Sequence, residues 1–262
     1  MKARAPIHRN QYSNPYQKEL RRSFKHWLKF VLGGYRSRHQ LKKVPKDFSY
    51  PRPSRTLNSN APKVTWINHS TFLIQHQDHT LLTDPIWSQR CSPFAFLGPK
   101  RTHPPAIDLK ALPKIDSVLV SHNHYDHLDR KSVAHLAENQ PHVHWYVPLG
   151  TRNWFRKFEI ENIVEFQWWD EYHTPCESLK MTFVPSQHHS GRTFFDQNKS
   201  LWGGFVVDFL NDQKKLYFAG DTGYNDIQFK QIGDHFKSID LSILPIGTYI
   251  PKQFMKSVHI SP

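Results

Sequence analysis

The chain has few cysteines and no long apolar segment. Its 262 residues include two cysteines, Cys91 and Cys176, and neither belongs to a CxxC pair. Neither a disulfide framework nor a thiolate metal site is therefore indicated, and a reducing cytoplasm fits this composition. No run approaches the roughly 18 apolar residues that a transmembrane helix needs. With 14 % aromatic residues, the composition favours a globular protein over a disordered or membrane-spanning one.

Acidic residues are scarce in the first part of the chain. The net charge is +13, and residues 1–47 hold thirteen Lys or Arg against Glu19 and Asp47. Most of the charge therefore belongs to an appendage, while the rest of the chain is close to neutral. Prolines punctuate this region and strand alternation is missing. We expect a basic, partly helical arm over residues 1–60 and a single domain over residues 61–262.

Residues 17–32 of the arm have helical periodicity, with an apolar side next to a basic one. The side chains that carry this pattern are Leu20, Phe24, Trp27 and Leu28, and Lys18, Arg21, Arg22 and Lys25. The helix could pack its apolar side on its own domain or lie on an anionic membrane surface. For the second alternative we expect peripheral membrane association, and tighter binding to anionic than to neutral liposomes.

Short strands recur from residue 64 onward, separated by a few helices. The predicted strands are 64–67, 72–75, 80–83, 117–120, 144–147, 163–167, 179–184, 202–209, 215–219 and 241–244, and the clearer helices are 130–138, 152–158 and 225–236. The early strands are spaced like hairpins, and helices come between the later ones. This order favours an α/β fold of two sheets with helices outside them.

The residues most indicative of chemistry follow the strand at 117–120. There, His122, His124, Asp126 and His127 form an H-x-H-x-D-H pattern. His122 and His124 turn to the same side of an extended loop and can bind one cation, while Asp126 and His127 turn toward a second position. Two such metals can share a hydroxide and stabilise both the attacking and the leaving oxygen. The pattern predicts a metal-dependent hydrolase.

Two further ligand candidates also follow predicted strands. His188 comes after the strand at 179–184, and Asp221 comes after the strand at 215–219. An aspartate there could bridge both metals, and Gly220 and Gly223 permit a tight backbone. Either residue alone would more often be a turn residue. Together with the histidine motif, we expect both to be metal ligands.

These six residues resemble the pattern of the metallo-β-lactamase fold, and Asp84 matches its early acidic position, which supports the ligands. The stretches that resemble the N-acyl-phosphatidylethanolamine-hydrolysing phospholipase D family include 83–86, 97–101, 121–128, 185–188, 218–224, 245–247 and 255–259. The resemblance runs from about residue 65 to residue 262. It implies a four-layer αββα sandwich.

The same resemblance implies two zinc ions. His122, His124, His188 and Asp221 would hold the first zinc, and Asp126, His127 and the shared Asp221 would hold the second. Asp126 and Asp221 would also orient the attacking hydroxide. His69 is expected close to the site without binding metal, and His259 near the substrate entrance. Other histidines, such as His189, are expected to be surface or packing residues.

The implied reaction is hydrolysis of N-acyl-phosphatidylethanolamine to an N-acylethanolamine and phosphatidic acid. The expected partners are a phospholipid substrate and an anionic membrane surface, without nucleic acid, and the oligomeric state is open, with a homodimer as one option. Three alternatives remain open: a lactonase or ester hydrolase with a small soluble substrate, a nuclease of the same fold, and an inactive truncated product.

The sequence departs from this family at two places. It has Asn68-His69 where the family usually has Gly-His. The family also continues past the position of Pro262 and supplies a last histidine to the second metal. We therefore expect the fold to lack its C-terminal elements, the second site to be weak, and the protein to hold closer to one zinc with low activity. His259 is not expected to replace that histidine, because no strand register aims it.

Overall fold

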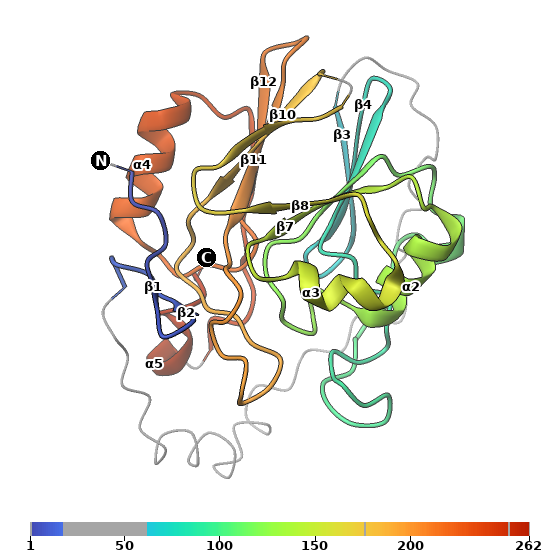
Figure 1. The fold of residues 1–262 in the computed structure, drawn as a ribbon, viewed down its shortest axis with the longest axis horizontal. Helices are drawn as coiled ribbons and strands as arrows, with labels where there is room; N and C mark the ends of the chain where they lie inside the picture. The colour runs from blue at the N-terminus through green and yellow to red at the C-terminus, as the bar shows by residue number, and fades with distance from the viewer. Residues whose placement is uncertain (1, 18–61, 176, 251, 262) are drawn as a thin grey trace, which may run out of the picture.

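Two β-sheets face each other in the structure, a computed structural model that describes residues 2–17, 62–175, 177–250 and 252–261 (Figure 1). The six-stranded sheet has the order β3 (Lys63–Asn68), β4 (Thr71–His76), β5 (His79–Thr83), β6 (Ser117–Leu119), β7 (His144–Pro148), β8 (Ile163–Phe166). The five-stranded sheet has the order β13 (Leu241–Ile243), β12 (Lys214–Phe218), β11 (Gly204–Phe209), β10 (Leu179–Val184), β9 (Glu171–His173).

Both sheets are mixed, and their topology brings several loops to one end of the sandwich. In the first sheet, β3, β4 and β5 are antiparallel neighbours, whereas β5 to β8 run parallel. The loops after β5 and β6 therefore leave the sheet at the same edge. In the second sheet, β10 and β12 both pair antiparallel with β11 and so run in the same direction. The loops after these four strands carry the six predicted metal ligands and Asp84.

The apolar faces of the two sheets pack on each other, and helices cover the outer faces. Ile74, Leu119 and Phe166 from the first sheet share a buried cluster with Phe183 and Phe205 from the second. Such interdigitating side chains are the main source of stability of a sheet sandwich.

The outer layers complete a four-layer αββα sandwich. Val133 and Leu136 of α2 (Arg130–Asn139), with Phe155 of α3 (Arg152–Phe155), cover the six-stranded sheet. Ile232 and Phe236 of α4 (Asp226–Phe236) cover the five-stranded sheet. The predicted α/β metallo-β-lactamase fold is thus confirmed. Each of the two longer helices begins at a side-chain cap, with Asp129 accepting from Ser132 N and Asn225 from Gln228 N.

Several short elements were not expected from the sequence. These are β9, the hairpin of β1 (Ile7–His8) and β2 (Gln11–Tyr12), the 3-10 helix η1 (Leu109–Ala111) and α5 (Lys252–Met255). The predicted helix at 152–158 is divided into α3 and the 3-10 helix η2 (Arg156–Phe158). Elements of two to four residues are too short to show a hydrophobic period.

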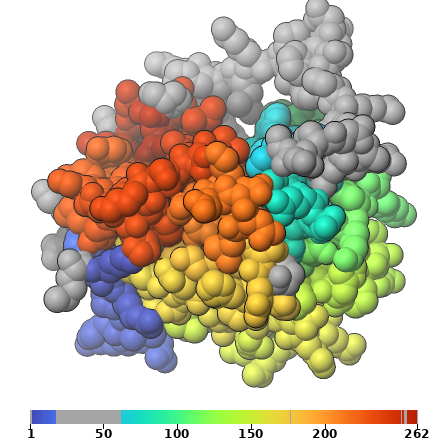
Figure 2. Space-filling model, turned by 90° about the horizontal axis from the view of Figure 1, so that it is seen from above, coloured from blue at the N-terminus to red at the C-terminus, as the bar shows by residue number. Residues whose placement is uncertain are grey.

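The first residues pack against the domain rather than extending from it. Arg4 forms an ion pair with Asp170 at 2.7 Å, and Asn14 Nδ2 donates to the carbonyl of Ser186 at 3.2 Å. In Figure 2 this segment, in blue, lies against the yellow and orange parts of the chain. Of the predicted helix at 17–32, only Gln17 belongs to the described residues. All eight proposed membrane-contact side chains lie outside them.

Candidate metal centre

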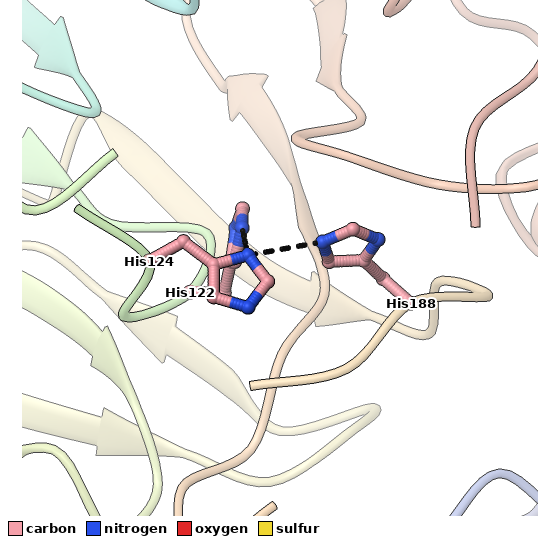
Figure 3. Close-up of side chains that lie close together, drawn as sticks. All are labelled: His122, His124 and His188. Atoms are coloured by element: carbon pink, nitrogen blue, oxygen red, sulfur yellow. Dashed lines mark hydrogen bonds between the residues drawn. The ribbon is translucent and has the colours of Figure 1, made fainter. Parts of the chain in front are cut away.

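Three histidines converge at the end of the sandwich (Figure 3). His122 and His124 lie in the loop after β6, and His188 lies in the loop after β10. His124 Nδ1 is 2.8 Å from His122 Nε2 and 3.3 Å from His188 Nε2. The H-x-H spacing and the distant His188 are thus brought together as the sequence predicts.

A second group of side chains lies beside these histidines. His127 Nε2 is 3.3 Å from Asp221 Oδ2 and 4.0 Å from Asp126 Oδ2. Asp221 Oδ2 is also 3.9 Å from His188 Nε2, so this carboxylate lies between the two groups. His69 Nε2 is 3.3 Å from both Asp126 Oδ2 and His127 Nε2. His69 adopts a left-handed backbone conformation, with φ 41°, at the turn after β3.

Buried hydrogen bonds fix the orientation of the His127 and His122 rings. His127 Nδ1 donates to Asp84 Oδ2 at 2.6 Å, and the Ser121 hydroxyl donates to the same oxygen at 2.6 Å. That hydroxyl lies 2.9 Å from His122 Nδ1, so it can accept from the ring. These partners place a proton on Nδ1, so that Nε2 is the ring nitrogen that faces the centre. Asp84, fully buried, therefore lies where the sequence places it, behind the ligand candidates.

The electrostatic environment favours neutral histidines and ionised carboxylates. Burial and the neighbouring histidines hold the pKa of His122 and of His188 well below the ordinary value. Burial likewise lowers the pKa of His124 to about 4. Neutral imidazoles are the form that binds metal.

The two carboxylates are shifted toward the charged form. Burial favours protonated Asp126 and Asp221, but the neighbouring histidines together outweigh burial and lower both pKa values. His127 and His69 act on Asp126, and His127, His188 and His259 act on Asp221. Burial lowers the pKa of His127 as well, yet the carboxylates of Asp221 and Asp126 raise it well above its ordinary range. In a site without a cation, His127 therefore supplies the compensating positive charge.

This set of donors fits metal ions. His122 Nε2 and His124 Nδ1 lie 2.8 Å apart. When both nitrogens present lone pairs they repel each other, and a shared cation removes that repulsion. Ligands about 2.0–2.1 Å from a tetrahedral zinc are separated by a little over 3 Å, close to these distances. Ligand atoms lie within 4.8 Å of one another in the groups His122/His124/His188, His69/Asp126/His127, Asp84/His122/His127 and His188/Asp221/His259.

The segment after α5 packs against the centre and orients His259. The carbonyl of Ser257 accepts from Gln187 Nε2 at 2.9 Å, and the carbonyl of Val258 accepts from His188 Nδ1 at 3.0 Å. A Cβ on Gly223 would lie 2.7 Å from the Ser257 carbonyl carbon, so glycine permits this close approach.

His259 Nδ1 consequently lies 3.7 Å from Asp221 Oδ2. His259 lies outside any strand, as expected, but hydrogen bonds to residues distant in sequence hold its segment in place. The supporting role of Val258 was not predicted, since its backbone carbonyl has no sequence signal.

An apolar cavity of about 450 Å³ opens beside the centre. Trp66, Phe72 and Phe218 line it together with residues 243–248, at the end of β13 and directly after it. Its polar part consists mainly of His69, Asp221 and His259. The cavity can therefore place apolar groups of a ligand next to the histidines and carboxylates.

The fold and this convergence of histidines and carboxylates define the class of metallo-β-lactamase-fold hydrolases. The family described as "Beta-lactamase superfamily domain" matches residues 79–262. N-acyl-phosphatidylethanolamine-hydrolyzing phospholipase D 1 of Caenorhabditis elegans is 38 % identical, over 76 % of this chain and 57 % of its own length. N-acyl-phosphatidylethanolamine-hydrolyzing phospholipase D, mitochondrial, of Saccharomyces cerevisiae is 34 % identical, over 76 % of this chain and 42 % of its own length.

The chain belongs to the β-lactamase superfamily. It spans about half the length of the curated relatives that it matches. Among solved structures, the metallo hydrolase Igni18 from the archaeon Ignicoccus hospitalis has a TM-score of 0.54 at 19 % identity, with 71 % of each chain covered. At this identity the likeness supports the fold alone.

Proposed function

We propose that this chain is a zinc-dependent phosphodiesterase of the phospholipase D type that acts on N-acyl-phosphatidylethanolamine-like lipids. The observation that carries the proposal is the position of the buried histidine and carboxylate centre beside an apolar cavity of about 450 Å³. A phosphodiester with long apolar substituents needs both features in one place. The names of the worm and yeast relatives support the same substrate class.

His122, His124, His188 and Asp221 would hold one zinc, and Asp126, His127 and Asp221 would hold a second. Bound zinc supplies Lewis-acid stabilisation of charge on the phosphoryl oxygens and lowers the pKa of a water. Asp126 and Asp221 accept hydrogen bonds from the attacking water and orient it toward phosphorus. Asp84 holds the His127 ring in place through the bond at 2.6 Å.

The two metal positions should differ in affinity. The first has three histidines whose pKa values are lowered, whereas the second has one histidine and two carboxylates. We expect zinc titration of metal-free protein to give one tightly bound ion and a second that a chelator removes readily. Two ions of equal, high affinity would contradict this assignment.

A substrate panel tests the proposed function. Zinc-loaded protein is assayed with N-acyl-phosphatidylethanolamine in detergent micelles, with a lactone and a carboxylic ester that are soluble in water, and with single-stranded DNA. The proposal expects hydrolysis of the lipid and its loss in His188→Ala. Hydrolysis of the lactone or ester alone would favour the small-substrate alternative, and hydrolysis of DNA would favour a nuclease.

A further inference from the structure

Two loops on one side of the molecule expose large apolar side chains. One follows β5 and includes Phe94, Phe96 and Leu97, and the other follows β10 and includes Phe194 and Phe195. The exposed fraction is 80 % for Phe96 and 86 % for each of Phe194 and Phe195. Figure 1 shows both loops, teal-green and orange, at the lower side of the molecule beyond α2 and α3. We call these five side chains the aromatic rim.

We propose that the aromatic rim inserts into the interfacial region of a lipid bilayer and thereby docks the metal centre on the membrane. Exposed phenylalanines are unfavourable in water, and a bilayer interface removes them from water without requiring a flat complementary surface. The inference deepens the proposed function and rests on it for the lipid substrate. It differs from the predicted contact through residues 17–32, because it assigns docking to the hydrolase domain itself.

Local hydrogen bonds hold the aromatic side chains outward. The Asp196 carboxylate accepts from Thr193 N at 2.6 Å and from Arg192 N at 2.9 Å, which closes a tight turn around Phe194 and Phe195. The base of the other loop is closed by Cys91 N donating to Pro99 O at 3.3 Å and by Arg101 N donating to Gln89 O at 2.9 Å. Ordered turns reduce the entropy that the loops lose on insertion.

Both loops are attached directly to the segments that form the metal centre. Gly191 N donates to Asn123 Oδ1, and Arg192 Nη1 donates to the carbonyl of Asn123, each at 2.8 Å. In the other loop, Ser88 N and Ser88 Oγ donate to the carboxylate of Asp129 at 3.1 and 2.7 Å, two residues after His127. Insertion of the loop tips would therefore bring the histidine motif close to lipid head groups.

The charge of the two loops matches an anionic lipid surface. Residues 88–104 contain Arg90, Lys100 and Arg101 and no acidic residue. Residues 189–200 contain Arg192 and Lys199 against Asp196, whose carboxylate is occupied by the turn. The guanidinium groups of Arg90, Arg101 and Arg192 likewise donate to backbone carbonyls of the protein. Lys100 and Lys199 are therefore the exposed basic side chains of the two loops. Basic side chains near an anionic leaflet are attracted to it. Aromatic tips beside basic residues thus favour a bilayer over an acidic peptide, which would not need exposed phenylalanines on separate loops.

Vesicle binding by the full chain tests this surface. The variant Phe96→Ser/Leu97→Ser/Phe194→Ser/Phe195→Ser is compared with the parent protein by cosedimentation. The vesicles are phosphatidylcholine alone or phosphatidylcholine mixed with phosphatidylglycerol. We expect at least about a tenfold weaker partition into both vesicle types, because each serine removes an apolar group that the bilayer would bury. The control is Leu210→Ser, since Leu210 is 38 % exposed and lies in the turn between β11 and β12, at the opposite side of the molecule in Figure 1.

Two more measurements separate the possible outcomes. In Phe194→Trp, addition of vesicles should shift the tryptophan fluorescence maximum to shorter wavelength. This shift should be larger than the one that vesicles cause in the parent protein. The four-serine variant should also keep turnover of a water-soluble phosphodiester while losing turnover of lipid in vesicles. Unchanged partition of that variant, or an equal loss in Leu210→Ser, would overturn the docking surface. Weaker vesicle binding without any phosphodiester turnover in the parent would contradict the proposed function and leave the docking surface standing.

Discussion

His122 and His188 each contribute a nitrogen to the three-histidine group. We expect His122→Ala and His188→Ala to lose most of the bound zinc, because a tetrahedral site with one ligand removed binds far more weakly. Elemental analysis after dialysis measures the loss. His189→Ala is the control, since His189 neighbours His188 but belongs to none of the four ligand groups. If zinc stayed unchanged in both ligand variants, the assignment would be wrong.

Asp84 acts on the centre through its partners rather than by facing the cavity. Its carboxylate accepts from Ser121 N at 2.7 Å, from Ser121 Oγ at 2.6 Å and from His127 Nδ1 at 2.6 Å. In Asp84→Asn an amide NH2 group, which can only donate, replaces one carboxylate oxygen. His127 Nδ1 then loses the oxygen that accepts its hydrogen bond. We expect zinc affinity to fall about 10- to 100-fold, measured by competition with a chelator.

Two controls accompany that variant. Circular dichroism should show the same secondary structure as in the parent protein, which separates loss of orientation from loss of the fold. Thr71→Ser retains a hydroxyl that can donate to the backbone carbonyl of Asp84, and it should keep parent-level affinity. An Asp84→Asn protein with unchanged affinity would show that the carboxylate is dispensable.

At the scale of elements, the segment 256–260 is held against the centre by hydrogen bonds from three other segments. Gln187→Ala removes the bond from Gln187 Nε2 to the carbonyl of Ser257. A bond of this kind contributes about 0.5–1.5 kcal/mol. We expect faster hydrogen exchange at the Ile260 amide, which donates to the Thr222 carbonyl. In the same variant, hydrogen exchange at the β11 amides should stay unchanged. In the control variant Gln197→Ala, exchange at the Ile260 amide should stay unchanged. Equal exchange in Gln187→Ala and the parent would mean that the segment is held by other contacts.

The elements show which parts of the fold follow from local sequence. β11 is buried along its whole length and β10 at all positions but Lys180, and their mainly apolar sequences made them predictable. By contrast, β9 has three residues with no buried side chain, and the β1–β2 hairpin depends on packing against segments near residues 170 and 186. Neither has a pattern that local analysis could detect.

The candidate site also contains residues that local sequence predicts and residues that it does not. His122, His124, Asp126 and His127 were identifiable from their spacing, and His188 and Asp221 from their places after strands. The orientation of His259 and the support from Val258 were not, because both depend on backbone hydrogen bonds between distant segments. The aromatic rim was missed for a related reason. Exposed phenylalanines cannot be distinguished from buried ones until the loops are placed.

At the scale of the whole molecule, the four-layer sandwich places loops from both sheets at one end, where they form the centre and its apolar cavity. Among the described residues, no helix is long and apolar enough to cross a membrane. The proposed contact of the aromatic rim with lipid does not depend on a spanning helix.

The central claim is that this centre hydrolyses the phosphodiester of a lipid by attack of water at phosphorus. The most direct measurement is hydrolysis of N-acyl-phosphatidylethanolamine by zinc-loaded protein in water enriched in oxygen-18, with mass spectrometry of both products. The account predicts that the label enters phosphatidic acid and not the N-acylethanolamine, and that His188→Ala forms neither product. Label in the N-acylethanolamine, or equal product formation by His188→Ala, would contradict it.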